Sequence, residues 1–469
     1  MNKKGFILFG IVLFFFFFFG AFGIHFFSDD FKFLAASKQF NLFSFFSPLR
    51  TTFYRPIPTE LFYYFLQQLP HSIITGHICI FIIFLIGIFF LYKTLILITK
   101  NKDLAFFSSI LYLFHFSHVY QLYWFATFQE VAQFTFLICS LYFILKKQFI
   151  ISIGLFILAL FSKEQALLFP FLAFMLYFMK YKNGDIFFII YFILDFIFIG
   201  IHLFVNSHMP ILPEYVIHLT PKLIINNVLW YGLWSVGFPA MMSDYMRSIL
   251  SLPFGTFWNY FTQPIFNIYF FGMLFYIISL IGSLCFILTT QVKERKRLVI
   301  YIVVGTSLFV FFLLPVLPII HKWMVRLTIP LVFMSVIEGL ILAILWKKKK
   351  AQKLVISLLT LYLIWNYFGI KFHETISTYM LESSINKQAI IVFGNVKRFE
   401  NCNVLYIKDP KQMRVSSWEG SEKIALTFSG DSFLSYYFPG RKDLKVKYDY
   451  KSKDPSFGDC IIDASELIQ

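Results

Sequence analysis

The sequence predicts an all-α polytopic membrane protein of about 11 transmembrane helices, followed by a small extracytoplasmic α/β domain. Of its 469 residues, 58% are hydrophobic and only 14% are charged, and the mean hydropathy is +0.72. Soluble domains average about 25% charged residues, so a water-soluble fold is excluded. The basic residues lie in short clusters between apolar stretches, as residues that orient membrane helices do. We therefore assign the net charge of +16 to topology and not to nucleic-acid binding.

The first apolar stretch follows Lys3 and Lys4 and runs to Phe27. It is longer than the roughly 7 to 15 residues of a signal-peptide core, which favours an uncleaved signal-anchor helix. With its basic start inside, Asp29 and Asp30 emerge outside the cytoplasm.

Ten further spans are predicted from the remaining apolar stretches. They cover approximately residues 72–98, 104–120, 131–145, 149–161, 166–179, 186–205, 268–290, 298–320, 327–346 and 354–370. With this assignment all basic clusters fall on one side, which the positive-inside tendency places in the cytoplasm. The sequence thus predicts a multi-pass protein of the inner or plasma membrane, with its C-terminal tail and its functional loops on the extracytoplasmic face.

Four regions follow from this topology: a transmembrane module (1–205), a long external loop (206–267), C-terminal transmembrane helices (268–370) and a soluble domain (371–469). The loop contains a short apolar piece, 228–242, which we interpret as an interfacial or re-entrant helix because a span there would invert every later basic cluster.

The soluble domain is predicted from a shift to mixed polar composition. Three short runs in it look like strands: 389–393, 404–407 and 424–428. Cys402 and Cys460 could form a disulfide if this domain lies outside the cytoplasm, although spacing alone does not establish the pair.

Ionisable residues lie near helix ends in several external loops. Asp29 and Asp30 could simply end the first helix at the interface. Alternatively, two adjacent carboxylates can separate their pKa values, so that one acts as a base and its neighbour orients it. Lys163 and Glu164 lie between two spans with almost no loop, where a charge pair is costly to hold near the membrane.

Cationic and imidazole side chains leave similar alternatives open. Arg55, Lys322 and Arg326 could be snorkelling anchors, or they could bind a lipid-linked phosphate. His115 and His118 are spaced for one face of a helix, which suits metal ligands, but no third ligand accompanies them, and packing roles are the alternative.

Taken in order, several motifs resemble the GT-C class of membrane glycosyltransferases. These are F-S-D-D-F, Y-R-P-I, H-x-x-H-x-x-x-x-x-W followed by an acidic residue, and L-F-S-K-E-Q-A-L-L-F-P-F. The likeness is closest to the branch with protein O-mannosyltransferases and bacterial aminoarabinose transferases. It covers residues 5–205, and more weakly the loop W-Y-G-L-W-S-V-G-F-P. The chain departs from it at Phe116, where many relatives carry proline.

The resemblance implies inverting transfer of a sugar from a polyprenyl-phosphate donor to a protein, lipid or glycan acceptor. It implies that Asp29 or Asp30 is the catalytic base, with Asp30 slightly favoured. Assignments for the other residues follow by position: Lys163, Arg55 and Arg326 would bind the donor phosphate, and Glu164, Glu130 and His118 would bind or orient the substrate. No metal or other cofactor is expected, and an assisting divalent cation is the open alternative.

A transporter or flippase of lipid-linked or amphiphilic substrates is the competing prediction. Such proteins carry mid-span charges and often a repeated half. Asp195 and Glu338 are mid-span candidates, but each is isolated and no second half matches the first. The chain also contains no P-loop or G-x-G-x-x-G motif, so a nucleotide site is not expected.

Overall fold

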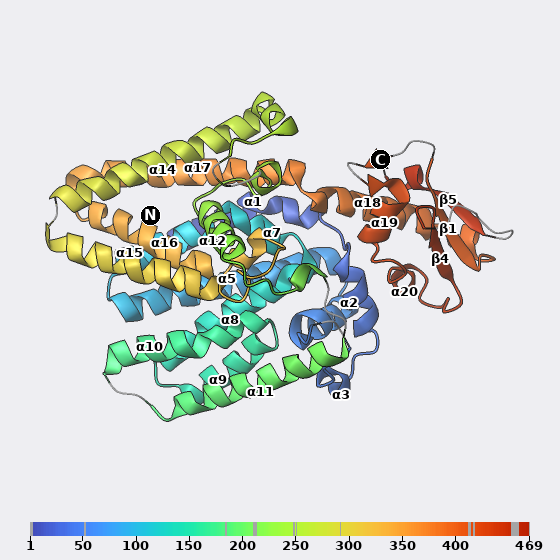
Figure 1. The fold of residues 1–469 in the computed structure, drawn as a ribbon, viewed down its shortest axis with the longest axis horizontal. Helices are drawn as coiled ribbons and strands as arrows, with labels where there is room; N and C mark the ends of the chain where they lie inside the picture. The colour runs from blue at the N-terminus through green and yellow to red at the C-terminus, as the bar shows by residue number, and fades with distance from the viewer. Residues whose placement is uncertain are drawn as a thin grey trace.

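Long antiparallel helices form most of the molecule, and a small sheet-containing segment projects from one end (Figure 1). The computed structural model describes residues 3–50, 53–182, 185–209, 213–246, 249, 251–290, 292–410, 414–415, 418–451 and 459–468. The long helices are α1 (Lys3–Phe17), α5 (Ser72–Thr99), α6 (Lys102–Leu113), α8 (Phe128–Ile144), α9 (Phe149–Leu160), α10 (Phe169–Tyr181), α11 (Phe187–His208), α14 (Pro264–Thr290), α15 (Val292–Leu313), α16 (Pro330–Trp346) and α17 (Gln352–Ile376).

Short helical pieces fill the connections between these helices. They are η1 (Phe19–Gly23), α2 (Asp29–Ser37), α3 (Leu42–Phe45), η2 (Ile57–Leu61), α4 (Phe62–Gln68), η3 (Phe116–His118), α7 (Val119–Leu122), η4 (Phe125–Thr127), η5 (Glu164–Leu168), η6 (Pro213–Tyr215), α12 (Pro221–Ser235), α13 (Met242–Tyr245), η7 (Gly255–Thr262), η8 (Met324–Leu327) and η9 (Lys349–Ala351).

Six helical segments within the described residues are long and apolar enough to cross a membrane. They are Ser72–Thr99, Phe125–Ile144, Phe187–His208, Pro264–Thr290, Glu294–Leu313 and Lys349–Ile376. The chain is therefore a multi-pass helical membrane protein, as expected. Helices also lie at the other predicted positions, but several are short, such as Phe149–Leu160 and Pro330–Trp346. The predicted count of eleven spans is not established by these lengths and stays a prediction.

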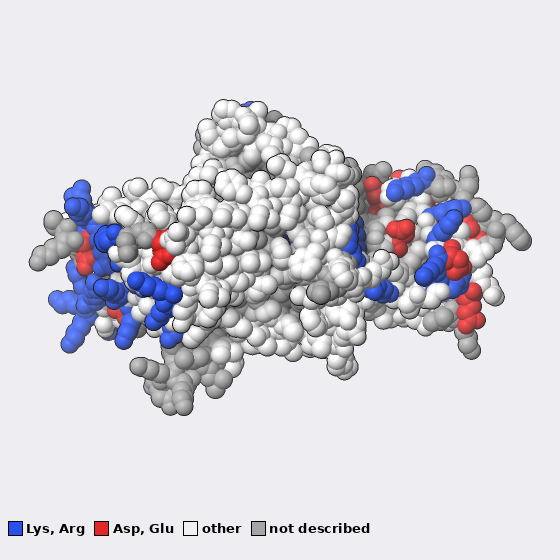
Figure 2. Space-filling model, turned by 90° about the horizontal axis from the view of Figure 1, so that it is seen from below, with Lys and Arg blue, Asp and Glu red and all other residues white. Residues whose placement is uncertain are grey.

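Charge divides the face of the molecule drawn in Figure 2 into three zones. Figure 2 shows Lys and Arg side chains gathered at one end, an uncharged belt in the middle, and mixed charges on the C-terminal segment. We call the first the basic end and the opposite end of the bundle the tail end. Lys100, Lys147, Lys182 and the run 347–350 follow the ends of α5, α8, α10 and α16, which run toward the basic end. An uncharged belt flanked by polar ends is what a bilayer requires of a spanning bundle.

Close helix approach is visible where glycine faces a neighbouring backbone. A Cβ on Gly339 of α16 would lie 2.7 Å from the backbone nitrogen of Ser108 on α6. Small residues let membrane helices pack at such short range, where dispersion is the main attraction. The α6–α16 contact is therefore set by the absence of a side chain at position 339.

The predicted span 104–120 does not form one continuous helix. Helix α6 ends at Leu113, and the chain continues as η3 and α7 at the tail end. In the long loop, the predicted apolar element is part of α12, whose Asn227 side chain donates to the carbonyls of Leu317 (2.8 Å) and Ile319 (2.9 Å). Helix α12 therefore covers the tail-end connection between α15 and α16.

The C-terminal segment, residues 378–468, contains α18 (Thr378–Gly394), η10 (Val396–Phe399), β1 (Val404–Lys408), β2 (Arg414–Val415), β3 (Trp418–Glu419), α19 (Gly420–Thr427), α20 (Leu434–Tyr437), β4 (Lys445–Tyr448), β5 (Cys460–Asp463) and η11 (Ala464–Glu466). Strands β4, β1 and β5 form a parallel sheet in that order, and β2 pairs with β3 in an antiparallel sheet. The α/β character of this segment is thus as expected.

Two of the three predicted strands are wrong. Residues 389–393 belong to α18 and residues 424–428 lie in α19 and the turn after it, whereas 404–407 is strand β1. In α18 the buried residues Ile385, Ala389 and Phe393 recur every four positions, which is the period of a helix face. The short apolar runs have a composition typical of strands. The spacing of apolar residues over the longer segment is that of a helix, and the segment forms a helix.

Cys402 and Cys460 form a disulfide. The sequence alone had left open whether these two cysteines pair. The bond ties the start of β1 to β5 across 58 residues of chain. Strands β1 and β5 are also hydrogen-bonded neighbours, with Leu405 opposite Cys460.

Replacing both cysteines with serine is expected to destabilise the C-terminal segment by about 4 kcal/mol, from the loop-closure entropy of a 58-residue loop. Limited proteolysis against temperature would measure the change. Cys285→Ser, at an exposed free cysteine, is the matched control and should leave the cleavage midpoint unchanged. Equal midpoints for the double variant and wild type would contradict the expectation.

Candidate functional site

Helix α2 at the tail end carries the two acidic residues in its first turn. Asp30 is completely buried, whereas 41% of the Asp29 side chain is exposed. Tyr63 on α4 donates a hydrogen bond to Oδ1 of Asp30 (2.5 Å), and the backbone N–H of Phe27 donates to Oδ2 (2.9 Å). Asp29 forms an exposed ion pair with Lys32 (3.0 Å). The two carboxyl groups therefore have different surroundings although they are adjacent in sequence.

Burial raises the pKa of Asp30 to about 8, although hydrogen bonds from Tyr63 and Phe27 act in the opposite direction. At neutral pH this side chain is consequently mostly a neutral carboxylic acid, and only its minor ionised fraction can accept a proton. The open side chain of Asp29 is the better placed of the two to meet a substrate.

Asp30→Asn is expected to flatten the pH dependence of stability. The folded state holds the Asp30 proton up to pH of about 8, while the unfolded chain releases it near pH 4, so the unfolding free energy falls as pH rises between these values. From pH 6 to 8 this amounts to about 2 kcal/mol, which the asparagine variant does not lose. Thermal unfolding of both proteins in detergent across this range checks it, and parallel curves would contradict it.

A second cluster lies at the tail-end connection between α9 and α10. Arg55 directly precedes Pro56, the residue that caps the start of η2. Its guanidinium makes two hydrogen bonds to Glu164 (2.6 and 2.8 Å) and one to Gln129 (2.6 Å). Burial alone would raise the pKa of Glu164, but the charges of Arg55 and Lys163 lower it to about 2. The pair is therefore ionised and oriented by a planar, two-point contact.

Lys163 forms a buried ion pair with Glu130 on α8. Burial lowers the pKa of Lys163, and the charge of Glu130 opposes that shift. Oε1 of Glu130 accepts a hydrogen bond from the ammonium group, while Oε2 is buried and has no hydrogen-bond partner among the described residues. The amide of Gln133 donates to the Lys163 carbonyl (2.9 Å), which fixes the turn that presents the ammonium.

Arg326 lies in η8 and is 4% exposed. It donates to the backbone carbonyl of His321 (2.5 Å) and lies beside Tyr231. Among the described residues, no carboxylate forms an ion pair with Arg326, in contrast to Arg55 and Lys163. A buried cation without a counter-ion is costly, so this position suits an anion brought by a ligand.

One helical stretch connects the acidic pair to the cationic cluster. Arg55 stands at the start of η2, and Tyr63, the partner of Asp30, lies in α4, which continues directly from η2. About eight residues of helix separate them, or about 12 Å along the axis. Phe62 of α4 stacks on Phe128 of α8 at a centroid distance of 4.0 Å, which holds this stretch against the helix that carries Glu130.

Aromatic side chains from distant segments pack beside the acidic pair. The ring of Trp124 stacks on Phe27 at 5.2 Å and lies 5.6 Å from Trp323 and 5.5 Å from Tyr379. The indole N–H of Trp124 donates to the Phe27 carbonyl. These contacts bring the first, second and late tail-end loops together with α18 around the start of α2.

The remaining predicted residues are placed as follows. His118 is fully buried, its Nε2 bonds the Tyr112 carbonyl (2.6 Å), and its ring lies against Phe84 and Tyr112. These are packing contacts, in line with the packing alternative. Lys322 is partly buried, and burial lowers its pKa while Asp244 opposes that shift.

Tyr63, Gln129 and Tyr379 were not predicted as site residues. Each is an uncharged residue among many aromatic and polar ones. Only the fold brings Tyr63 to Asp30, Gln129 to Arg55 and Tyr379 to Trp124. The π-helical start of η2 also contains Glu60, paired with Arg50 at 2.7 Å. Arg50 and Glu60 are ten positions apart, and no local sequence signal indicated that they form a pair.

Within the described part of the chain, no group of three or more His, Cys, Asp or Glu residues has the geometry to hold a metal ion. His115 and His118 lie with ring centroids 6.4 Å apart, and Nδ1 of His115 bonds the hydroxyl of Ser117 (2.8 Å).

Comparisons with known protein families, with characterised proteins and with solved structures gave no significant match to this chain.

Proposed function

We propose that the protein is a membrane glycosyltransferase that moves a sugar from a polyprenyl-phosphate donor to an acceptor hydroxyl or amine, with inversion. The observation that carries the proposal is the buried Arg326 without a carboxylate partner among the described residues. It lies at the same end of the bundle as Arg55, Lys163 and the acidic pair. In this reaction the cations would stabilise the negative charge of the phosphate that leaves. The carboxylate would accept the proton that the acceptor must lose.

In this mechanism Asp29 takes the proton of the acceptor, whose oxygen or nitrogen attacks the anomeric carbon while the bond from that carbon to the phosphate oxygen breaks. Asp29 rather than Asp30 is assigned as base because it is open and because Asp30 is neutral at pH 7. Asp30 instead anchors the first turn of α2 through Tyr63 and Phe27.

Arg326 would bind the donor phosphate most directly. Arg55 and Lys163 are each held by a carboxylate, so a phosphate has to compete with Glu164 and Glu130 for them. Fixed cations aimed at the leaving oxygen stabilise the charge that develops there, and their positions do not need to reorganise during the reaction.

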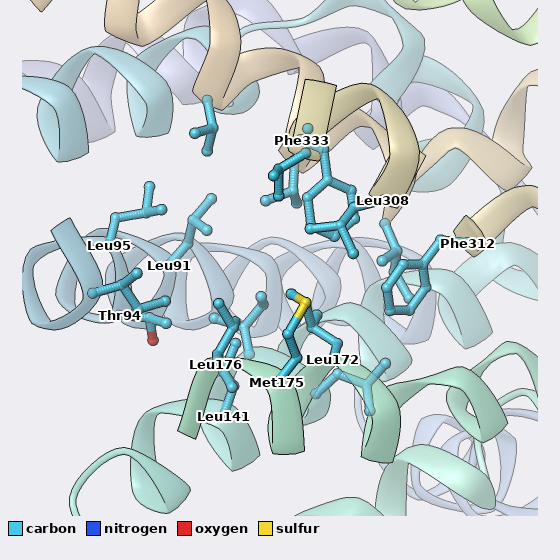
Figure 3. A pocket seen from close by; sticks show the side chains of 18 of the residues that line it. Leu91, Thr94, Leu95, Leu141, Leu172, Met175, Leu176, Leu308, Phe312 and Phe333 are labelled. Atoms are coloured by element: carbon cyan, nitrogen blue, oxygen red, sulfur yellow. The ribbon is translucent and has the colours of Figure 1, made fainter. Parts of the chain in front are cut away.

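An apolar cavity below this cluster supports a lipid-linked donor. It has a volume of about 210 Å³ and lies between α5, α8, α10, α15 and α16. Figure 3 shows Leu91, Leu172, Leu308 and Phe333 directed toward it, with the Thr94 hydroxyl as a rare polar group in its wall. Its tail-end lining includes Ile329, one turn beyond Arg326, so a phosphate at the arginine could extend its chain into the cavity.

The orientation of the site is part of the proposal. Lys and Arg side chains gather at the basic end (Figure 2), which the positive-inside tendency assigns to the cytoplasm. The acidic pair and the cations then face the extracytoplasmic side of the inner or plasma membrane.

The test uses purified protein in liposomes with radiolabelled polyprenyl-phosphate sugars and a panel of hydroxyl and amine acceptors. Transfer of label to an acceptor, with release of polyprenyl phosphate, supports the proposal. Movement of the intact donor between leaflets without any transfer would overturn it in favour of a lipid transporter. Protein-free liposomes provide the background for both measurements.

A further inference from the structure

Two segments from opposite ends of the chain meet at the start of α2. The backbone N–H of Ser28 donates to the carbonyl of Thr427 (2.5 Å), in the last turn of α19. The last carbonyls of a helix have no partner within the helix, and Ser28 supplies one of these partners. Thr427 is fully buried, so this contact lies inside an interface and is shielded from water.

Ser28 adopts φ 52° and ψ −123°, a left-handed conformation that a residue with a side chain rarely takes. Such strain persists only where the surroundings impose it. This conformation turns the chain so that the N–H of Phe27 reaches the Asp30 carboxyl (2.9 Å) and the Asp30 N–H reaches the Phe27 carbonyl (3.1 Å).

Aromatic packing reinforces the contact. Phe31, completely buried on α2, lies against Phe428 (5.6 Å), Tyr436 (5.8 Å) and Tyr437 (6.2 Å) of the C-terminal segment. Tyr436 also lies 6.0 Å from Phe26. The two faces of the Ser28 turn are thus both covered by residues that are distant in sequence.

Further polar contacts join the same two regions. The His25 N–H donates to the hydroxyl of Ser383 (2.8 Å), and the ammonium of Lys38 bonds the Ser435 carbonyl. Lys423 and Glu382, a buried pair inside the C-terminal segment, connect α19 to α18. The segment therefore holds α2 at its start, along its buried face and at its end.

We infer that the C-terminal segment is a positioning element for the site: through Thr427 and Tyr436 it holds the strained Ser28 turn, and with it the Asp29–Asp30 pair. In the proposed mechanism the segment contacts no reacting atom. The catalytic part of the inference rests on the proposed function, whereas the structural part does not.

The test compares two matched pairs of variants. Tyr436→Ala removes the packing on Phe26 and Phe31, and Tyr436→Phe keeps it. Ser28→Pro removes the N–H and forbids the positive φ, whereas Ser28→Gly keeps the N–H and adopts that φ without strain.

The first readout needs no sugar transfer. The protein is treated with dicyclohexylcarbodiimide, an apolar reagent that reacts with protonated carboxyl groups. Mass spectrometry of the peptide that contains Asp30 then measures the extent of labelling at each pH. The groups that face Asp30 are Asp29 on its own helix, Tyr63 on α4 and Tyr379 on α18. None of them is changed by these variants, so a shift reports the position of α2.

We expect Tyr436→Ala and Ser28→Pro to move the labelling midpoint down from pH of about 8 by at least one unit. Both should also lower kcat for transfer at least about tenfold with the donor KM unchanged, as loss of orientation does, while Tyr436→Phe and Ser28→Gly match wild type. An unchanged midpoint in both disruptive variants, measured on monodisperse protein, would overturn the inference. If wild type transfers no sugar, the proposed function fails, but the labelling still decides whether the segment holds α2.

Discussion

Asp29→Asn is expected to lower sugar transfer by about 10²- to 10⁴-fold, the range that removal of a general base costs. The amide keeps the size of the side chain and cannot take a proton. Because 41% of the Asp29 side chain is exposed and its ion pair with Lys32 is a surface contact, the fold should lose little stability. Initial rates with saturating donor, together with thermal unfolding of the same preparation, measure the two effects separately.

Asp30→Asn is the matched control for this prediction. Asparagine resembles the neutral carboxylic acid that Asp30 is at pH 7, and its amide group can still bond Tyr63 and Phe27. We expect less than about a tenfold change in transfer. The reverse pattern, a severe loss at position 30 and a mild one at position 29, would assign the base to the buried carboxyl and contradict the assignment of Asp29 as the base.

Arg326→Gln is expected to weaken binding of polyprenyl phosphate by about 30-fold or more, since truncating one partner of a buried charged contact costs about 2 to 5 kcal/mol. In the absence of donor the same change should leave thermal stability equal or higher, because it removes a buried charge that has no ion-pair partner among the described residues. Titration of polyprenyl phosphate into the protein in nanodiscs, alongside unfolding of the donor-free protein, gives both quantities.

The contrast with Arg55 makes this result specific. Arg55→Gln breaks the two-point contact with Glu164 and leaves that partly buried carboxylate without its main partner. Arg55→Gln should therefore lower the stability of the donor-free protein, whereas Arg326→Gln should leave it equal or higher. If Arg326→Gln also destabilised it, or bound polyprenyl phosphate as wild type does, Arg326 would be a structural residue and not a phosphate ligand.

Much of the helical architecture could be predicted because a bilayer imposes strong rules on composition and charge. Stretches such as 72–98 and 268–290 are long and apolar and are followed by basic residues, and they form α5 and α14. The break after Leu113 was not predicted. The polar residues His115, Ser117 and His118 each find a hydrogen-bond partner inside the protein, and hydropathy does not report such contacts. The strands assigned to 389–393 and 424–428 were wrong because short apolar runs do not distinguish a buried strand from a helix face.

For the candidate site, charged residues could be identified from the sequence, but their pairing could not. The pairing of Lys163 with Glu130, not with its neighbour Glu164, depends on how α8 and the turn after α9 pack. Asp29 and Asp30 are likewise buried to different degrees because α2 packs one of its faces against Tyr63. Asp30 lies on that face and Asp29 does not. The contact of Ser28 with Thr427 joins residues about 400 positions apart, and no local pattern indicates it.

That contact sets an order of events during biosynthesis. Ser28 leaves the ribosome about 400 residues before Thr427, which at about 5 to 20 residues per second is an interval of roughly 20 to 80 seconds. Throughout that interval the first loop lacks the carbonyl that completes its turn, and the Cys402–Cys460 bond, which ties β1 to β5 in the segment that supplies it, cannot yet exist. A nascent or truncated chain in the membrane would thus lack the contact that positions its acidic pair. The pair would reach its final position only after the last part of the polypeptide had been synthesised.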